Sequence, residues 1–191
     1  MPSEIEAKFK VASFAAMRLR LRQTGAVFLG SVLQTDRYFD DADGGLRASD
    51  RGLRIRSEKR LRSGDAPFDP RPQVTFKGPA HVASRVKIRS ELQTRVDDHK
   101  ALVAIFDALG LAPTLTIQKK RSSYRLNNVI IELDELPLIG RFVEIEAPSE
   151  RAIHKVRQKL VLPDEPMKDH YINLMLAAAR ERGIKGTQFV F

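Results

Sequence analysis

The sequence predicts an α+β protein in which helices surround an eight-stranded antiparallel β-barrel that forms a tunnel. About eight segments alternate charged with apolar residues, and a strand with this period has one charged and one apolar face. Four other segments have helical spacing, and they do not alternate regularly with the strands as a parallel sheet would require. An antiparallel sheet curled into a barrel would bring the charged faces together inside and leave the apolar outside to the helices. We expect one such domain over residues 1–191.

The first two predicted strands flank a helix. Residues 4–10 alternate Glu and Lys with apolar residues, and Ser13 is positioned to cap a helix that runs to about Thr24. Residues 26–39 form the second strand, and the Asp-Gly-Gly sequence at 43–45 predicts a turn. A phosphate-binding glycine loop is disfavoured at this turn because no Lys-Ser or Lys-Thr pair follows it.

Three further strands are predicted in the middle of the chain. Residues 52–56 place two arginines on one face, and residues 73–79 form a strand that ends at a Gly-Pro pair. Between them, residues 63–72 hold one glycine and three prolines, which indicates a surface loop. Residues 84–92 carry the longest charged stripe, although an edge strand protected by charges would look similar.

The C-terminal half contributes three strands and three helices. Asp97 or Asp98 can cap a helix that ends near Leu109, before Gly110. The next helix starts at Ser149, with apolar residues at helical spacing. The remaining predicted elements are strands at 114–121 and 124–134, joined near 122–123 or 127–128, a strand at 141–147, and a last helix over about 168–182.

The charge of the chain suggests an anionic partner. Thirty-three Lys and Arg against 24 Asp and Glu give a net charge of +9. The basic residues are spread along the strands and interleaved with acidic pairs, and only 7% of residues are aromatic, which disfavours nucleic acid. A small, densely charged anion bound together with a metal ion fits this pattern better.

Other features of the composition exclude further classes. The sequence has no cysteine and no apolar stretch long enough for a membrane span, and its first residues do not form a secretory signal. We therefore expect a cytoplasmic protein without a membrane partner. The four histidines lack the close spacing of metal ligands, which disfavours a zinc enzyme. Nothing in the sequence predicts the oligomeric state.

Two acidic pairs would face each other if their strands formed a hairpin through residues 136–140. In one register Glu132 lies opposite Glu146. The same register sets Asp134 opposite Glu144, and like charges at such positions are destabilising. At an effective dielectric near 20, each opposed pair repels by about 3–4 kcal/mol. The arrangement therefore favours a bound cation.

Carboxylates without histidine or cysteine ligands favour a hard ion, Mg²⁺ or Mn²⁺. The predicted metal-side residues are Glu4, Glu6, Glu132, Asp134, Glu144 and Glu146. Spacing alone leaves open that these carboxylates simply pair with neighbouring Lys and Arg. The basic side chains that could surround an oligophosphate are Arg54, Arg56, Lys77, Arg85, Lys87, Arg89, Lys119, Arg121 and Arg125. A solvated charged face remains the alternative for the arginines at 54 and 56.

An ordered series of motifs resembles the CYTH domain, or triphosphate tunnel metalloenzyme, family. The opening Glu4-x-Glu6-x-Lys8 looks like the family signature. The other matching segments are residues 35–40, 53–56, 75–79, 89–91, 119–121, 132–134 and 140–146. The resemblance implies an eight-stranded tunnel in which basic side chains grip a triphosphate and acidic ones hold a divalent metal. It adds Lys8 to the phosphate-side residues and implies that Glu91 lines the tunnel.

The resemblance implies a reaction on a triphosphate. In hydrolysis of inorganic, thiamine or nucleoside triphosphate, a carboxylate such as Glu4 or Glu6 would orient the attacking water, and Lys8 would contact phosphate. Class IV adenylyl cyclases, which convert ATP to cyclic AMP and pyrophosphate, are the alternative. Those enzymes tend to carry a His-Phe pair before the opening motif and a Ser-Tyr pair near the end, and this chain instead has Met-Pro-Ser and His170-Tyr171. This departure favours hydrolysis, and a non-catalytic triphosphate-binding module stays as a further alternative.

Overall fold

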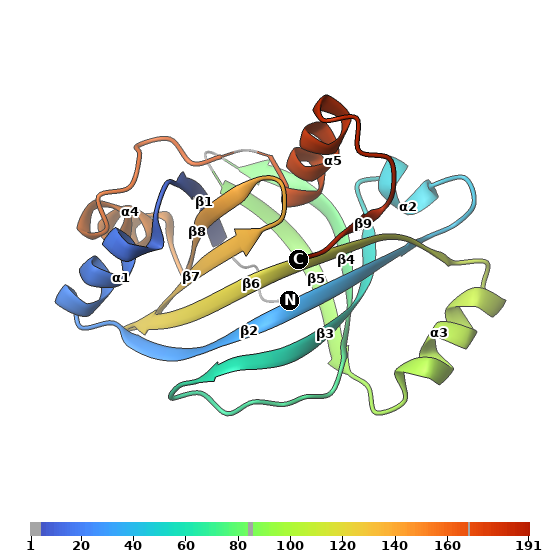
Figure 1. The fold of residues 1–191 in the computed structure, drawn as a ribbon, viewed down its shortest axis with the longest axis horizontal. Coiled ribbons are helices and arrows are strands. Elements are labelled where there is room, and N and C mark those ends of the chain that lie inside the picture. Colours follow the sequence, from blue (N-terminus) through green and yellow to red (C-terminus); the bar gives the residue numbers. More distant parts are fainter. Residues whose placement is uncertain (1–4, 84–85, 168) are drawn as a thin grey trace.

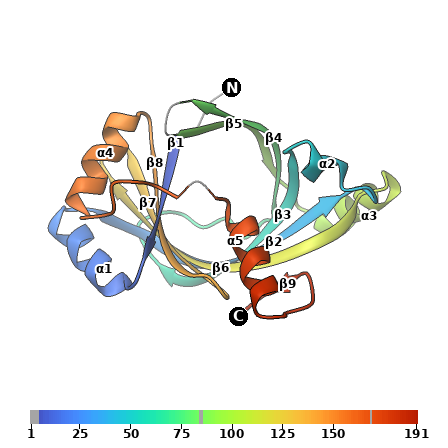
Figure 2. The same ribbon diagram turned by 90° about the horizontal axis from the view of Figure 1, so that it is seen from above.

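A tunnel-shaped barrel of eight antiparallel strands forms the centre of the structure (Figures 1 and 2). The computed structural model describes residues 5–83, 86–167 and 169–191. For residues 80–83 and 86–89 it describes only the backbone. The strands are β1 Ile5–Val11, β2 Val27–Asp40, β3 Gly52–Ser63, β4 Gln73–Ala83, β5 Val86–Arg95, β6 Ala112–Leu126, β7 Val129–Leu136 and β8 Gly140–Ala147. The predicted fold class is confirmed.

The order of the strands closes the barrel. It runs β2-β3-β4-β5-β1-β8-β7-β6, and a long antiparallel pairing between β6 and β2 completes the ring. The seam between β1 and β5 is the shortest, with Glu6 opposite Lys87 as its one paired position among the described residues. Since β5 pairs with β4 on its other side, the edge-strand interpretation of residues 84–92 is wrong.

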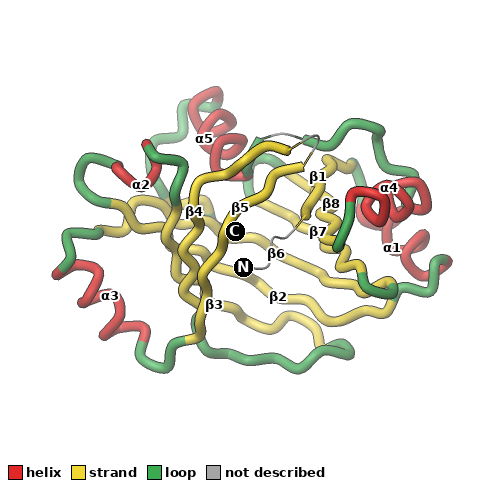
Figure 3. The backbone as a smooth tube through the Cα atoms, turned by 180° about the vertical axis from the view of Figure 1, so that it is seen from behind, coloured by secondary structure: helices red, strands yellow, loops and turns green. Residues whose placement is uncertain are grey.

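In the described part of the chain, five helices lie outside the barrel. They are α1 Phe14–Gln23, α2 Gly45–Ala48, α3 His99–Ala108, α4 Glu150–Lys159 and α5 Tyr171–Glu181. Ser13, Asp98 and Ser149 cap α1, α3 and α4, because each side chain accepts a hydrogen bond from a backbone N–H in the first turn. Helices α1 and α4 lie together beside β1 and β8, whereas α3 lies at the other end of the molecule (Figures 2 and 3). None of the helices in the described part of the chain is long and apolar enough to cross a membrane.

The apolar faces of the strands turn outward to the helices. Phe9 of β1, Ile131 of β7 and Val143 of β8 pack with Leu21 and Leu160 in the cluster under α1 and α4. Fully burying such a side chain contributes about 1.5–3 kcal/mol. Smaller apolar clusters lie under α5 and beside α3. Period-two alternation then turns the charged faces of the same strands into the tunnel.

Several local predictions differ from the structure. Strand β4 continues past Gly78-Pro79 to Ala83, with a register shift between Lys77 and Ala80 that accommodates a residue without an N–H. The turn at 43–45 leads into the short helix α2, because the Asp40 carboxylate accepts the N–H groups of Leu46 and Arg47. Strands β6 and β7, in contrast, join at residues 127–128, which confirms the second of the two predicted junctions. Helix α5 begins at Tyr171, three residues after the predicted position.

The predicted register of the β7–β8 hairpin is wrong by two residues. Glu132 pairs with Glu144 instead of Glu146, because a three-residue loop connects Leu136 to its partner Gly140. Leu138 in this loop has a φ of 63° and Gly140 a φ of 89°. The loop is therefore centred on Leu138, one residue earlier than the predicted register requires.

A ninth strand, β9 Gln188–Phe189, was not predicted. It pairs in parallel with β6, and Phe189 is buried in the cluster under α5. A two-residue strand is too short to show the alternation on which the other predictions depend.

Candidate active site in the tunnel

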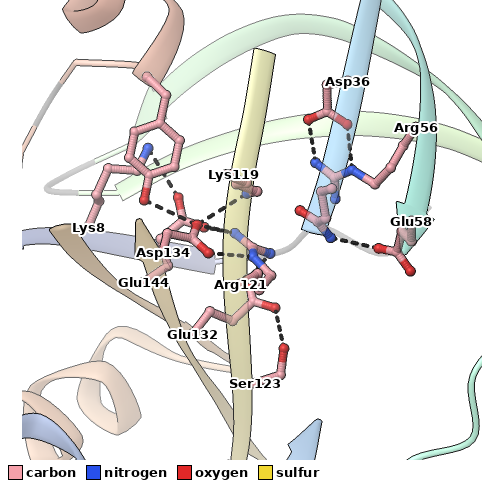
Figure 4. Close-up of polar contacts among 12 residues, drawn as sticks. Lys8, Asp36, Arg56, Glu58, Lys119, Arg121, Ser123, Glu132, Asp134 and Glu144 are labelled. Carbon is pink, nitrogen blue, oxygen red and sulfur yellow. Dashed lines mark hydrogen bonds and ion pairs between the residues drawn. The ribbon is translucent and has the colours of Figure 1, made fainter. Parts of the chain in front are cut away.

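Buried charged side chains converge inside the barrel (Figure 4). They come from β1, β2, β3, β6, β7 and β8, where each occupies an inward position of its strand. Charges removed from water are stable only when they are paired and hydrogen-bonded, so their contacts define the site. The buried members are Lys8, Asp36, Arg56, Lys119, Arg121, Glu132, Asp134 and Glu144.

Arg121 lies at the centre of an acidic group. Its Nε donates to Asp134 Oδ1 at 2.7 Å and its Nη2 to Asp134 Oδ2 at 2.5 Å. The same guanidinium forms ion pairs with Glu132 and Glu144. Lys119 Nζ lies 3.1 Å from Asp134 Oδ2, and Asp134 has no exposed side-chain surface. The pairing of carboxylates with basic residues, which the sequence left open, therefore holds for these three acids.

Lys8 joins this network from β1. Its Nζ lies 3.2 Å from Glu144 Oε1 and 3.8 Å from the centre of the Tyr171 ring. Burial raises the pKa of Glu144, but the charges of Arg121, Lys119 and Lys8 hold it well below its ordinary value. Burial and the neighbouring Arg121 lower the pKa of Lys119 from 10.5 to about 8. Glu144 is therefore an anion in the folded protein, and an approaching anion would favour the protonated form of Lys119.

The carboxylates form two groups whose oxygens lie within 4.8 Å of one another. One consists of Glu6, Glu144 and Glu146 from β1 and β8. The other consists of Glu132, Asp134 and Glu144. Oxygen donors at this spacing suit a hard divalent cation such as Mg²⁺ or Mn²⁺, so the donor chemistry of the chain fits the expected metal.

A second ion-pair cluster links β2 and β3. Arg56 donates from Nε and Nη2 to the two oxygens of Asp36 at 2.6 and 2.7 Å, and Arg54 Nη1 lies 3.2 Å from the same carboxylate. Burial raises the pKa of Asp36, but Arg54 and Arg56 hold it well below its usual range. Asp36 was not predicted as a site residue. Its position opposite Arg56 could be found only from the pairing of β2 with β3.

The other predicted residues lie farther from this network or outside the described residues. Lys77 of β4 forms an ion pair with Glu91 of β5, and both side chains are part-exposed. Arg125 contacts Asp65 at 3.3 Å with half of its side chain exposed, so it does not join the buried cluster. Glu4 and Arg85 lie outside the described residues, as do the side chains of Lys87 and Arg89.

Tyr171 is a further residue of the site that sequence reasoning did not predict. It is the first residue of α5, and its hydroxyl donates to Asp134 Oδ2 at 3.3 Å. Its ring packs edge-on against Phe142, with the ring centres 5.0 Å apart. The position of Tyr171 in the sequence is remote from every strand of the tunnel, and only the packing of α5 against the barrel brings it to Lys8 and Asp134.

Comparisons with known proteins agree with this geometry. The family model of the CYTH domain matches residues 2–174. A protein from Methanocaldococcus jannaschii named "Putative adenylate cyclase MJ0240" is 28% identical over 165 residues, which cover 86% of each chain.

Solved structures show the same fold. The PH1012 protein from Pyrococcus horikoshii OT3 is 28% identical with a TM-score of 0.71, covering 90% of this chain and 98% of its own. HpAC1 from Hippeastrum, described as a "Putative adenylyl cyclase" with "a dominant triphophatase activity", is 17% identical with a TM-score of 0.68, covering 91% of this chain and 95% of its own. The curled antiparallel barrel, its charged interior and the family match over most of the chain establish that this protein belongs to the CYTH domain family of triphosphate tunnel metalloenzymes.

Proposed function

We propose that this chain is a divalent-metal-dependent triphosphatase that binds its substrate inside the tunnel. The observation that carries the proposal is the contact of buried cationic side chains with a group of carboxylates. Lys8 and Arg121 both contact Glu144, which also belongs to the Glu6–Glu146 group. A triphosphate needs such cations around its oxygens, and a metal ion needs the carboxylates.

The group of Glu6, Glu144 and Glu146 is the one that we expect to hold the metal. Glu6 and Glu146 are only half-buried, so a hydrated ion can reach them, whereas Glu132 and Asp134 of the other group are buried and contact Arg121. When bound, Mg²⁺ or Mn²⁺ would supply Lewis-acid polarisation of a phosphoryl oxygen and a less basic water. Glu132 and Asp134 would instead hold Arg121 and Lys119 in place.

The basic side chains would bind and orient the phosphate groups. Lys8 contacts Glu144 and Lys119 contacts Asp134, while Arg54 and Arg56 lie on the β3 wall next to Asp36. Fixed positive charges aimed at the transferring phosphoryl group stabilise the charge that develops there, without reorganisation during the reaction. A carboxylate such as Glu6 would orient the attacking water and accept its proton as the new oxygen–phosphorus bond forms at the terminal phosphorus. The bond from that phosphorus to the bridging oxygen would break, and the diphosphate part of the substrate would leave.

The second candidate function is that of a class IV adenylyl cyclase. It is supported by the name of the M. jannaschii relative, which matches over most of both chains. In that reaction the ribose 3′-hydroxyl would attack the α-phosphorus and release pyrophosphate. The same cationic lining serves both reactions, so the products must distinguish them.

A product-resolved assay tests the proposal. The purified protein is incubated with Mg²⁺ or Mn²⁺ and with inorganic triphosphate, thiamine triphosphate or ATP, and orthophosphate, pyrophosphate and cyclic AMP are measured. We expect orthophosphate release that a chelator abolishes and that Glu6→Gln reduces by about 100-fold or more. Cyclic AMP with pyrophosphate would establish the cyclase instead. Tight binding without any product would overturn both enzyme functions and favour the non-catalytic binding module.

A further inference from the structure

A pocket of about 280 Å³ opens from the tunnel beside Arg121. Its walls come from β2, β3, β6 and β7 and from the loop that follows β3. The polar and aromatic side chains used below are Gln34, Glu58, Arg60, Arg62, Phe68 and Glu132. Because Arg121 and Glu132 line both the pocket and the ion-pair network, a molecule bound at the network can extend into the pocket.

Gln34 lines this pocket, and its side chain contains a buried hydrogen-bond acceptor without a partner among the described residues. The residue is 4% exposed, and this acceptor is Oε1. The orientation of the amide is fixed, because Nε2 donates to Glu58 Oε1 at 2.7 Å and a carboxylate can only accept. A buried acceptor left without a donor is unfavourable, so the pocket is suited to a ligand that supplies an N–H or O–H at this position.

Flat cationic and aromatic groups form the outer wall of the pocket. The Arg60 guanidinium lies 4.6 Å from the centre of the Phe68 ring, and Arg62 lines the pocket beside them. The loop that carries Phe68 is tied to β2, because the N–H groups of Asp65 and Ala66 donate to backbone carbonyls of that strand. Guanidinium and phenyl planes stack well on a neutral planar ring.

We propose that this pocket binds the nucleobase end of a nucleoside triphosphate, with Gln34 Oε1 accepting a hydrogen bond from a base or sugar N–H or O–H. This inference rests on the proposed function, since the triphosphate itself would occupy the adjoining ion-pair network. Inorganic triphosphate has no group that donates to Gln34. Thiamine triphosphate carries a cationic ring, which Arg60 and Arg62 would repel. The geometry of the pocket thus selects one of the three substrate classes.

Binding measurements without turnover test this inference. The dissociation constants of adenosine 5′-(β,γ-methylene)triphosphate, inorganic triphosphate and thiamine triphosphate are measured by calorimetry with a chelator present, so that the proposed metal-dependent hydrolysis of the last two ligands cannot proceed. For the wild-type protein we expect the nucleotide to bind about tenfold more tightly than the other two. Gln34→Met removes the acceptor with little change in shape and should reduce this preference by about tenfold. Phe68→Ala, at a part-exposed position, should reduce the same preference without affecting the interior of the barrel.

Gln118→Met is the matched control. This glutamine lies on β6 and donates to Thr35 Oγ1 at 3.2 Å, and it does not line the pocket. In the Gln118→Met variant, the ratio of the dissociation constant of the nucleotide to that of inorganic triphosphate should equal the wild-type ratio. A ratio that stays unchanged in both Gln34→Met and Phe68→Ala would overturn the inference while leaving the proposed function intact. Tighter binding of thiamine triphosphate than of the nucleotide would also overturn it. Failure of all three ligands to bind would instead refute the proposed function.

Discussion

Replacing Arg121 with methionine removes the cation that holds three buried carboxylates together. In the folded protein Glu132, Asp134 and Glu144 all contact its guanidinium, and their side chains are at most 10% exposed. Among the described residues, Lys8 would still contact Glu144 and Lys119 would still contact Asp134. The variant therefore leaves three largely buried carboxylates with two lysines to compensate their charge.

The expected loss is large. Removing one partner of a buried ion pair costs about 3–5 kcal/mol, and for a chain of this size such a loss lowers the melting temperature by about 6–20 °C. Without Arg121, the largest charge that lowers the pKa of Glu144 is gone and burial raises this pKa, so the Glu144 carboxyl group can be buried in the neutral form as the solution becomes acidic. The difference between variant and wild type should therefore narrow as the pH falls from 7 to 5.

Urea unfolding followed by circular dichroism measures the free energy of unfolding of both proteins at each pH. Arg125→Met is the matched control on the same strand, because the Arg125–Asp65 pair is 50% and 60% exposed and contributes only about 0–1 kcal/mol. A loss for Arg121→Met no larger than that of the control would refute the reasoning. So would a large loss that stays constant between pH 7 and pH 5.

Two further predictions concern the other acidic residues. The pKa of Asp36 lies well below its ordinary value of 3.8, so its ion pairs stabilise the protein fully above about pH 4 and this stability is lost as the pH falls further. Asp36→Asn should lower the free energy of unfolding by about 3 kcal/mol at pH 7. Between pH 4 and pH 2 the free energy of unfolding of the variant should fall less steeply than that of the wild type. Equally steep falls of the two proteins in urea titrations at acid pH would contradict this. Glu146→Gln should weaken Mn²⁺ binding by about tenfold or more in a paramagnetic resonance titration, while Glu132→Gln should leave it nearly unchanged because Glu132 does not belong to the Glu6–Glu144–Glu146 group. Equal losses in the two variants would place the metal between the groups.

The elements with strong periodicity could be predicted from the sequence. Strand β1 and the helices α1 and α4 follow their residue patterns closely, and Ser13 and Ser149 cap those helices as expected. The end of β4 and the short strand β9 could not be predicted. A glycine-proline pair usually ends a strand, and only the pairing of β4 with β5 on both sides of the bulge shows that it continues.

The residues of the candidate site could likewise be predicted only in part from the sequence. The alternation of residues showed which side chains share the charged face, and this applied to Lys8, Arg121 and Glu144. It could not show that Asp36 faces Arg56, or that Gln34 faces Glu58, since those contacts depend on the register between β2 and β3. The predicted opposition of Glu132 and Glu146 was wrong for the same reason, because the loop conformation sets the register.

The sequence by itself thus determined which faces of the strands are charged, because side-chain direction along a strand is a local property with a period of two. It also identified the family, because the family's motifs occur along this chain in the expected order. Only the tertiary structure decided which charges meet, because strand pairing and barrel closure join residues that are distant in sequence. The contacts of Arg121 with the acids of β7 and β8, the approach of Tyr171 from α5, and the unpaired acceptor of Gln34 all depend on that closure.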